Sequence, residues 1–193
     1  MGFLDPPTWA AWRHHPEREG FEVAFIDRHP DGCRVHGTTT GVEDGVPVVV
    51  EYRIEVDGAW RTLRAEVRST SRAGEARVVV EGDGGGHWRV DGQRRPELDG
   101  CLDVDVETSC LTNTFPVHRL ALAGGEAAEA SAAYVRGADL AVLRLEQTYR
   151  RLEDDGARQR YDYASPTVDF ACRLTYDESG LVLDYPRVGS RAG

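Results

Sequence analysis

The sequence has no lysine, only one methionine, and no hydrophobic run long enough to cross a membrane. All 23 basic residues are therefore arginine, and 33 acidic residues give a formal net charge of −10. A nucleic-acid-binding protein needs a basic surface to neutralise phosphates, so this charge predicts no nucleic-acid partner. The surface of an anionic membrane would repel it as well.

Targeting and metal-binding signals are also missing. Met1–Pro7 contains no basic segment followed by an apolar core, so we expect no secretory signal. The four cysteines form no C-x-x-C pair and show no zinc-like spacing, which favours reduced, mostly buried thiols in a cytosolic protein. We therefore expect a cytoplasmic location. The cysteines are Cys33, Cys101, Cys110 and Cys172.

Turn signals, in contrast, are abundant. Asp-Gly recurs along the chain and supplies the positive φ that tight hairpin turns require. The segments between these turns leave room for short strands but little for long helices. No linker or repeat divides the 193 residues, so we expect one domain over residues 1–193. The pairs begin at Asp31, Asp44, Asp57, Asp83, Asp91, Asp99 and Asp155.

The segments between turns alternate between apolar and polar residues. Val46–Val56, Leu63–Val67 and Val168–Tyr176 each place apolar side chains on one face and charged side chains on the other. Because a shift of one residue would exchange the two faces, this pattern fixes which side of each strand meets the core. The sequence therefore predicts an all-β, mainly antiparallel fold.

Two segments remain ambiguous. Leu140–Leu152 is rich in good helix formers, yet its apolar residues fit a helical stripe and a strand face equally well. Ser109–His118 suits a short helix or a tight irregular connection, with Ser109 or Thr112 as a candidate N-cap.

Motifs of well-known catalytic sites are missing. The sequence has no G-x-S-x-G, no P-loop, no G-x-G-x-x-G that opens a helix, and no H-E-x-x-H. Gly84–Gly86 lies between strand-like segments without a following helix or lysine. It therefore indicates a hairpin loop and not a phosphate-binding loop.

An acidic segment around residue 100 is unusual. If Leu98–Glu107 is extended, four carboxylates and Cys101 share one face and four apolar side chains share the other. Three interpretations stay open: a solvated outer face, the lining of a wet cavity paired with arginines, or a calcium or magnesium site. The carboxylates are Asp99, Asp103, Asp105 and Glu107, and the apolar residues are Leu98, Leu102, Val104 and Val106.

This segment carries a resemblance to a known family. Leu98–Asp105 reads Leu-Asp-Gly-Cys-Leu-Asp-Val-Asp, and Thr112–Leu120 reads Thr-Asn-Thr-Phe-Pro-Val-His-Arg-Leu. Together they resemble the hallmark stretch of the putative glycolipid-binding family, first catalogued as a domain of unknown function. The resemblance extends over residues 9–188. Its other pieces are Trp12, Glu22, Tyr52-Arg53, Asp57–Arg61, Gly86-His-Trp88, Gln147-x-Tyr149, Tyr161-x-Tyr163 and Gly180–Pro186.

The chain departs from the family pattern in two places. Ser109-Cys110-Leu111 replaces a shorter Pro-Phe pair, and His118 stands where the family has an arginine. The second change removes one fixed positive charge, which puts any anion contact there in doubt.

The resemblance implies a fold and a function. The fold is a spiral β-roll, a single curled antiparallel sheet wrapped around one short helix, similar to periplasmic carriers of lipoproteins. It implies that Leu140–Leu152 is strand and that the helix lies near Ser109–Pro116. Because function does not follow from fold alone, the implied binding of a glycolipid is a hypothesis.

The first functional hypothesis is non-catalytic binding of a glycolipid or other amphiphilic molecule in the lumen of the curled sheet. An acyl chain needs an apolar slot, and its head group needs a few polar residues at the entrance. Core packing for the aromatic residues, and ion pairs with the acidic segment for the arginines, are the structural alternatives. The candidates are Trp60, Arg61, Trp88, Asp99, Asp103, Asp105, Asn113, His118, Arg119, Gln147, Tyr149, Tyr161, Tyr163 and Tyr185.

The second hypothesis is a hydrolase acting on a sugar or lipid conjugate. His118 together with Asp99, Asp103 or Asp105 could perform general acid–base catalysis. No residue is marked as a nucleophile, so we expect binding and not catalysis, with no cofactor and no metal. A third hypothesis is a scaffold whose outer sheet face binds another protein.

Overall fold

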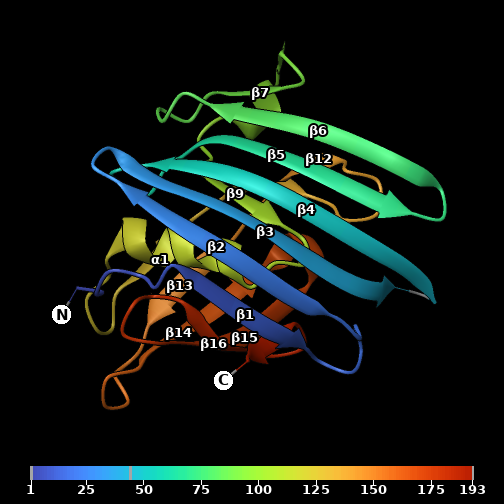
Figure 1. Cartoon of the computed structure of the whole chain (residues 1–193). Coiled ribbons are helices and arrows are strands. Elements are labelled where there is room, and N and C mark those ends of the chain that lie inside the picture. The colour runs from blue at the N-terminus through green and yellow to red at the C-terminus, as the bar shows by residue number, and fades with distance from the viewer. Residues whose placement is uncertain (1, 44, 193) are drawn as a thin grey trace.

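The computed structural model describes residues 2–43 and 45–192. A 14-stranded antiparallel sheet curls around a 3-stranded sheet and a short helix within these residues (Figure 1). The all-β, mainly antiparallel class is thus confirmed, and the small inner sheet is an addition to the single sheet that we expected. The curled sheet does not close into a barrel, since β10 and β8 are its free edges.

The first half of the chain forms one side of the curl as a series of hairpins. β3 and β4 extend over 12 residues each and pair along their whole length, and β4 alternates apolar and polar residues from Val50 onwards. The strands are β1 (Trp9–His14), β2 (Phe21–His29), β3 (Gly32–Glu43), β4 (Val46–Asp57), β5 (Thr62–Ser71), β6 (Gly74–Gly82), β7 (Trp88–Val90) and β8 (Gln93–Arg94).

The last part of the chain forms the other side. β17 pairs with β1, so the two ends of the chain join the hairpin series into one continuous sheet. Trp12 on β1 also links this strand to β16, because its indole Nε1 donates to the carbonyl of Val182 at 2.7 Å. The strands are β10 (Ala127–Glu129), β13 (Thr148–Arg151), β14 (Gln159–Ser165), β15 (Phe170–Tyr176), β16 (Val182–Tyr185) and β17 (Gly189–Arg191), and a 3-10 turn at Pro166–Val168 connects β14 with β15.

The middle of the chain fills the curl. β9 pairs parallel with β11, and β11 pairs antiparallel with β12. The helix α1 follows a buried 3-10 turn and presents Phe115 and Val117 to the core. The elements are a 3-10 turn at Pro96–Leu98, β9 (Asp103–Val106), a 3-10 turn at Leu111–Asn113, α1 (Thr114–Leu120), β11 (Ala132–Val135) and β12 (Val142–Leu145).

The helix begins and ends somewhat later than the sequence indicated. We expected it near Ser109–Pro116, and α1 spans Thr114–Leu120. Pro116 lies in its first turn, where the missing backbone N–H leaves no hydrogen bond unmade. The helix ends at Leu120, because the next residue, Ala121, has a left-handed φ of 45°.

Most of the other local predictions are confirmed. Leu140–Leu152 contains β12 and β13 and no helix. In β4 the residues from Val48 to Val56 alternate buried and exposed, whereas Val46 at the strand's start is exposed. The Asp-Gly pairs lie in turns between strands or directly after the Pro96–Leu98 turn, except that Asp44 lies outside the described residues. No helix in residues 2–43 and 45–192 is long and apolar enough to cross a membrane.

One glycine allows a close approach across the inner face of the sheet. A Cβ at Gly37 would lie 2.4 Å from the hydroxyl of Tyr52. Because Gly37 has no side chain, Tyr52 on β4 reaches over β3 and donates to Glu22 on β2 at 2.7 Å. This contact belongs to a buried polar network that continues towards the helix.

Candidate binding cleft

A cleft of about 310 Å³ opens between the small inner sheet and the last strands of the large sheet. This volume lies at the lower end of the range for small-molecule sites. Four of the residues that we predicted from sequence meet there: Asp105, Asn113, Tyr163 and Tyr185. The other lining residues are Glu17, Arg18, Glu107, Ser109, Tyr134, Leu145, Val168, Phe170, Arg187 and Val188.

Asp105 on β9 is the buried acid of the cleft. The hydroxyl of Thr112 donates to its Oδ1 at 3.0 Å, and the amide of Gln147 donates to its Oδ2 at 2.6 Å. Burial raises the pKa of Asp105 to about 6, although both hydrogen bonds oppose the rise. A carboxylate has about four acceptor positions, so Asp105 retains capacity for a ligand.

Tyrosines and an asparagine extend this network along the cleft. The same Gln147 amide donates to the hydroxyl of Tyr163 at 3.0 Å. Asn113 precedes the helix, and its Oδ1 accepts a hydrogen bond of 2.9 Å from the hydroxyl of Tyr149. Tyr149 is fully buried, so it supports Asn113 from behind and does not line the cleft.

An aromatic wall faces these polar groups. Tyr163, Phe170 and Tyr185 pack against one another, with ring centroids 6.0–6.2 Å apart. Leu145 and Val168 add aliphatic surface beside them. The cleft thus has a polar side and an apolar side, the arrangement that an amphiphilic ligand requires.

Charged residues surround the mouth. Glu17 and Arg187 form an exposed ion pair of 3.5 Å, and the Arg187 guanidinium lies 5.7 Å from the centre of the Phe170 ring. Arg18 donates to the carbonyl of Glu107 at 3.2 Å. Arg187 has a φ of 67°, an unfavourable conformation for a residue with a side chain and one often found at functional positions.

A second buried carboxylate lies directly behind the cleft. The hydroxyl of Ser109, which lines the cleft, donates to Glu22 at 2.6 Å, and the backbone N–H of Cys110 donates to its other oxygen at 2.6 Å. Glu22 has no exposed surface, and burial raises its pKa to about 7 despite these bonds. Glu22 therefore anchors the segment before the helix to β2.

The acidic segment does not present one uniform face. Asp103 is buried, and it accepts from Nε of Arg119 at 3.1 Å and also from the same guanidinium's Nη2. Burial raises the pKa of Asp103, and Arg119 opposes this rise. Asp103 and Asp105 point inwards, whereas Asp99 precedes the strand and is exposed. The solvated-face interpretation therefore applies to Asp99 alone.

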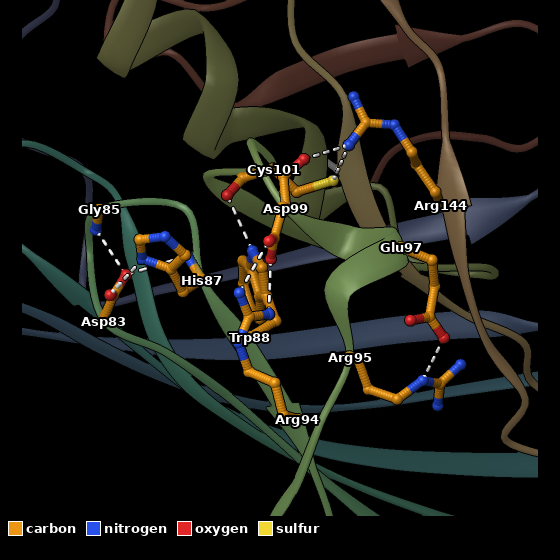
Figure 2. A network of polar contacts seen from close by, with 10 residues as sticks. All are labelled: Asp83, Gly85, His87, Trp88, Arg94, Arg95, Glu97, Asp99, Cys101 and Arg144. Atoms are coloured by element: carbon orange, nitrogen blue, oxygen red, sulfur yellow. Dashed lines mark hydrogen bonds and ion pairs between the residues drawn. The ribbon is translucent and has the colours of Figure 1, made fainter.

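The surroundings of Asp99 form a separate polar network (Figure 2). Arg94 donates to both oxygens of Asp99 at 2.6 and 2.7 Å, and Arg144 donates to its carbonyl at 2.6 Å. Trp88 is buried here and donates to the carbonyl of Cys101 at 2.8 Å. Neither Asp99 nor Trp88 lines the cleft, so both stabilise the turn that leads into β9.

The glycine-rich segment is part of the same region. Gly84–Gly86 connects β6 with β7, as the hairpin interpretation predicted. Asp83 closes this loop by accepting from the backbone N–H groups of Gly85 at 2.7 Å and His87 at 3.0 Å (Figure 2).

His118 and Trp60 lie away from the cleft. Their rings stack with centroids 3.9 Å apart, and Nε2 of His118 lies 3.0 Å from the carbonyl of Ser179. Burial lowers the pKa of His118 to about 4. Within the described residues, His118 forms no hydrogen bond or ion pair with Asp99, Asp103 or Asp105. This geometry does not provide the acid–base pair that the hydrolase hypothesis needs.

The remaining sequence candidates support the fold. Arg61 pairs with Asp57 at 2.7 Å in the turn after β4. Tyr161 is buried and donates to Gln159 at 3.0 Å. Three of the four cysteines are buried, Cys172 is half-buried, and all four are free thiols. In the described part of the chain, no group of three or more His, Cys, Asp or Glu side chains could hold a metal ion.

Sequence reasoning missed several residues of the cleft. Glu17, Arg18 and Arg187 come from loops near the two ends of the chain, and Tyr134 and Phe170 come from two different sheets. Their positions depend on the pairing of β1 with β17 and of β9 with β11, which no local pattern reveals.

Comparisons with known proteins agree with this architecture. The sequence model of the family described as "putative glycolipid-binding" matches residues 9–191. A search of the curated proteins gave no match. Among solved structures, the crystal structure of a DUF1089 family protein from Pseudomonas aeruginosa is similar, with a TM-score of 0.76 and 31% sequence identity. The similarity covers 100% of this chain and 97% of that chain.

Proposed function

The chain belongs to the putative glycolipid-binding family, and from this premise we propose that its cleft binds a glycolipid-like amphiphile without catalysing a reaction. The observation that carries the proposal is the contrast between the two sides of the cleft. Asp105 and Asn113 provide hydrogen-bonding groups on one side, and Tyr163, Phe170 and Tyr185 provide apolar surface on the other.

The polar side suits a head group that carries hydroxyls. Ionised Asp105 can accept from a hydroxyl, and protonated Asp105 can donate to one. Thr112 and Gln147 fix the carboxyl in place, so little conformational entropy is lost when it binds a ligand. A vicinal pair of sugar hydroxyls matches this arrangement, because it offers a donor and an acceptor side by side.

The apolar side suits the alkyl part or the C–H face of a sugar ring. The three aromatic rings hold one another in place, and Leu145 extends their surface. At about 310 Å³ the cleft holds a head group and the first part of a chain, so the rest of a long acyl chain would lie beyond it.

A comparison of simple amphiphiles tests the proposal. We expect n-octyl β-D-glucoside, titrated below its critical micelle concentration, to bind more tightly than an octyl chain with a short polyethylene glycol head or glucose alone. Chemical-shift changes should centre on Tyr163 and Phe170. Asp105→Asn should weaken binding of the glucoside about tenfold, which corresponds to about 1.4 kcal/mol.

Asp99→Asn is the matched control, because it changes an exposed aspartate in the same acidic segment. It should leave the affinity unchanged. Equal binding of the glucoside and the polyethylene glycol ether, or equal effects of the two substitutions, would contradict the proposal. Native mass spectrometry after incubation with a lipid extract would then identify the natural ligand class.

A further inference from the structure

A row of side chains crosses the outer face of the large sheet, on the side opposite the cleft. In register, Trp9 on β1 opposes Phe25 on β2, and Phe25 opposes His36 on β3. His36 opposes Arg53 on β4, and Arg53 opposes Glu66 on β5. We call these five residues the outer ladder. Neighbouring strands lie about 4.8 Å apart, so the ladder is about 19 Å long.

The aromatic end of the outer ladder is unusually exposed. Trp9 is 56% exposed and Phe25 is 47% exposed. The rings of Phe25 and His36 are stacked, with centroids 5.1 Å apart and planes 18° apart. They form an exposed aromatic pair on a sheet face that no other element of the described chain covers (Figure 1).

The charged end of the ladder borders a groove of about 420 Å³ over β2 to β5. Glu66 accepts hydrogen bonds from Arg68 and Arg77 and is therefore already paired. The side chain of Arg53, in contrast, forms no hydrogen bond or ion pair within the described part of the chain, although it lies in the middle of the groove. The guanidinium of Arg53 is thus available to a ligand.

The groove differs from the rest of the protein in its charge. Its lining contains two arginines, Arg53 and Arg68, and two glutamates, Glu51 and Glu66, so their charges cancel. The whole chain carries −10. A groove without net charge, with both donors and acceptors beside an exposed aromatic pair, is complementary to an uncharged polyhydroxylated molecule.

We propose that the outer ladder binds a neutral oligosaccharide chain, with sugar rings stacked on Phe25 and His36 and hydroxyls bonded to Arg53 and Glu51. A pyranose ring has an apolar C–H face and a hydroxyl-bearing edge, which match the aromatic pair and the groove, respectively. The length of the ladder suits a chain of several sugar units. This site is separate from the cleft and does not depend on the function proposed for it.

Other occupants fit less well. An added peptide strand needs a free sheet edge, whereas the ladder crosses β1 to β5 in the interior of the sheet. A strongly anionic ligand would meet Glu51 and Glu66. A second copy of the chain would need a patch of about 800 Å² per partner, in which charged residues are usually depleted at the centre.

Titration with defined sugars tests the proposal. The neutral probes are cellohexaose, maltohexaose and chitohexaose, and hexagalacturonate is the acidic comparison. Binding of each probe to the full chain is measured by NMR and calorimetry. We expect at least one neutral hexasaccharide to bind with millimolar affinity or better and to shift the signals of Phe25, His36 and Arg53. Phe25→Ala should weaken this binding about tenfold or more, and Arg53→Gln should weaken it severalfold.

Two controls make the result specific. Val49→Ala removes an exposed apolar side chain from the same sheet face outside the groove, and Asp105→Asn alters the cleft. Neither should change the sugar affinity. The proposal is overturned if no neutral probe binds, if hexagalacturonate binds more tightly, or if Phe25→Ala has no effect. It is also overturned if sedimentation shows a dimer of the wild-type chain that Phe25→Ala dissociates.

Discussion

Carboxylates inside the curl and on its outer face both accept hydrogen bonds, but their pKa values are shifted in opposite directions. Inside, Glu22 and Asp105 each accept short hydrogen bonds, and yet burial raises their pKa values to about 7 and about 6. On the outer face, Glu66 also accepts several hydrogen bonds. There the bonds from Arg77 and Arg68 lower its pKa to about 2.

The difference shows that hydrogen bonding alone does not set the charge state of an acid. Desolvation outweighs two or three neutral donors in the interior, whereas arginine partners dominate where water is near. Glu22 and Asp105 can therefore change protonation state near neutral pH, whereas Glu66 remains ionised. The two proposed ligands differ in burial as well. In the cleft, a head-group hydroxyl would bond to a buried carboxyl, whereas on the outer ladder a sugar would bind at the exposed surface.

The largest expected effect comes from breaking the buried ion pair. Arg119→Ala leaves Asp103 buried without its partner, and we expect the free energy of unfolding to fall by about 3–5 kcal/mol. Arg94→Ala removes the same kind of partner from exposed Asp99 and should cost much less, because solvent screens this pair. Urea denaturation of both variants checks the comparison. Equal losses would show that burial does not distinguish the two pairs.

The next effect is a dependence of stability on pH. Burial raises the pKa of Glu22 to about 7 in the folded protein, from the ordinary value of 4.5 for an exposed glutamate. Between these values the folded state holds a proton that the unfolded state has lost. The stability therefore decreases as pH rises from about 4.5 to 7, by an amount on the order of 3 kcal/mol from this group.

Glu22→Gln should remove this contribution, so its unfolding free energy should vary less between pH 5 and pH 8 than that of the wild type. Glu66→Gln is the matched control from the outer face. The pKa of Glu66 is lowered, so its contribution to stability is lost only as pH falls from about 4.5 towards 2. The slope between pH 5 and pH 8 should therefore remain that of the wild type. An unchanged slope in Glu22→Gln would contradict the role of burial.

The sequence predicts strands of the large sheet well, but it does not predict which carboxylates are buried inside the curl. Alternation in Val46–Val56 depends on neighbouring residues, so it correctly identified the buried face of β4 from Val48 onwards. The strand content of Leu140–Leu152 needed the family resemblance, because propensity and periodicity conflicted there. Asp103 and Asp105 were recognised as unusual, but their burial follows from a parallel pairing of β9 with β11 that no local pattern encodes.

Prediction of the cleft residues was limited in the same way, because local patterns do not reveal which distant strands pair. Asp105, Asn113, Tyr163 and Tyr185 lie within family-like segments and do line the cleft. Trp88 and Tyr161 lie in such segments too, but they are buried, because large aromatic side chains also pack in the core. Arg18 and Arg187 carry no distinguishing pattern, since only the junction of β1 with β17 brings their loops together.

The smallest effect tests whether neutral hydrogen bonds follow the same rule as charged ones. Tyr149→Phe removes a fully buried hydroxyl and leaves Oδ1 of Asn113 without this donor, so we expect a loss of about 1–2 kcal/mol of unfolding free energy. Arg77→Ala removes a charged but exposed partner of Glu66 and should cost less, because water replaces the lost contact. The neutral bond should matter more, because an unpaired buried oxygen cannot be hydrated, whereas water replaces Arg77 at the surface. If thermal or urea denaturation gave the opposite order, the charge of a polar contact and not its burial would determine how much it contributes to the unfolding free energy.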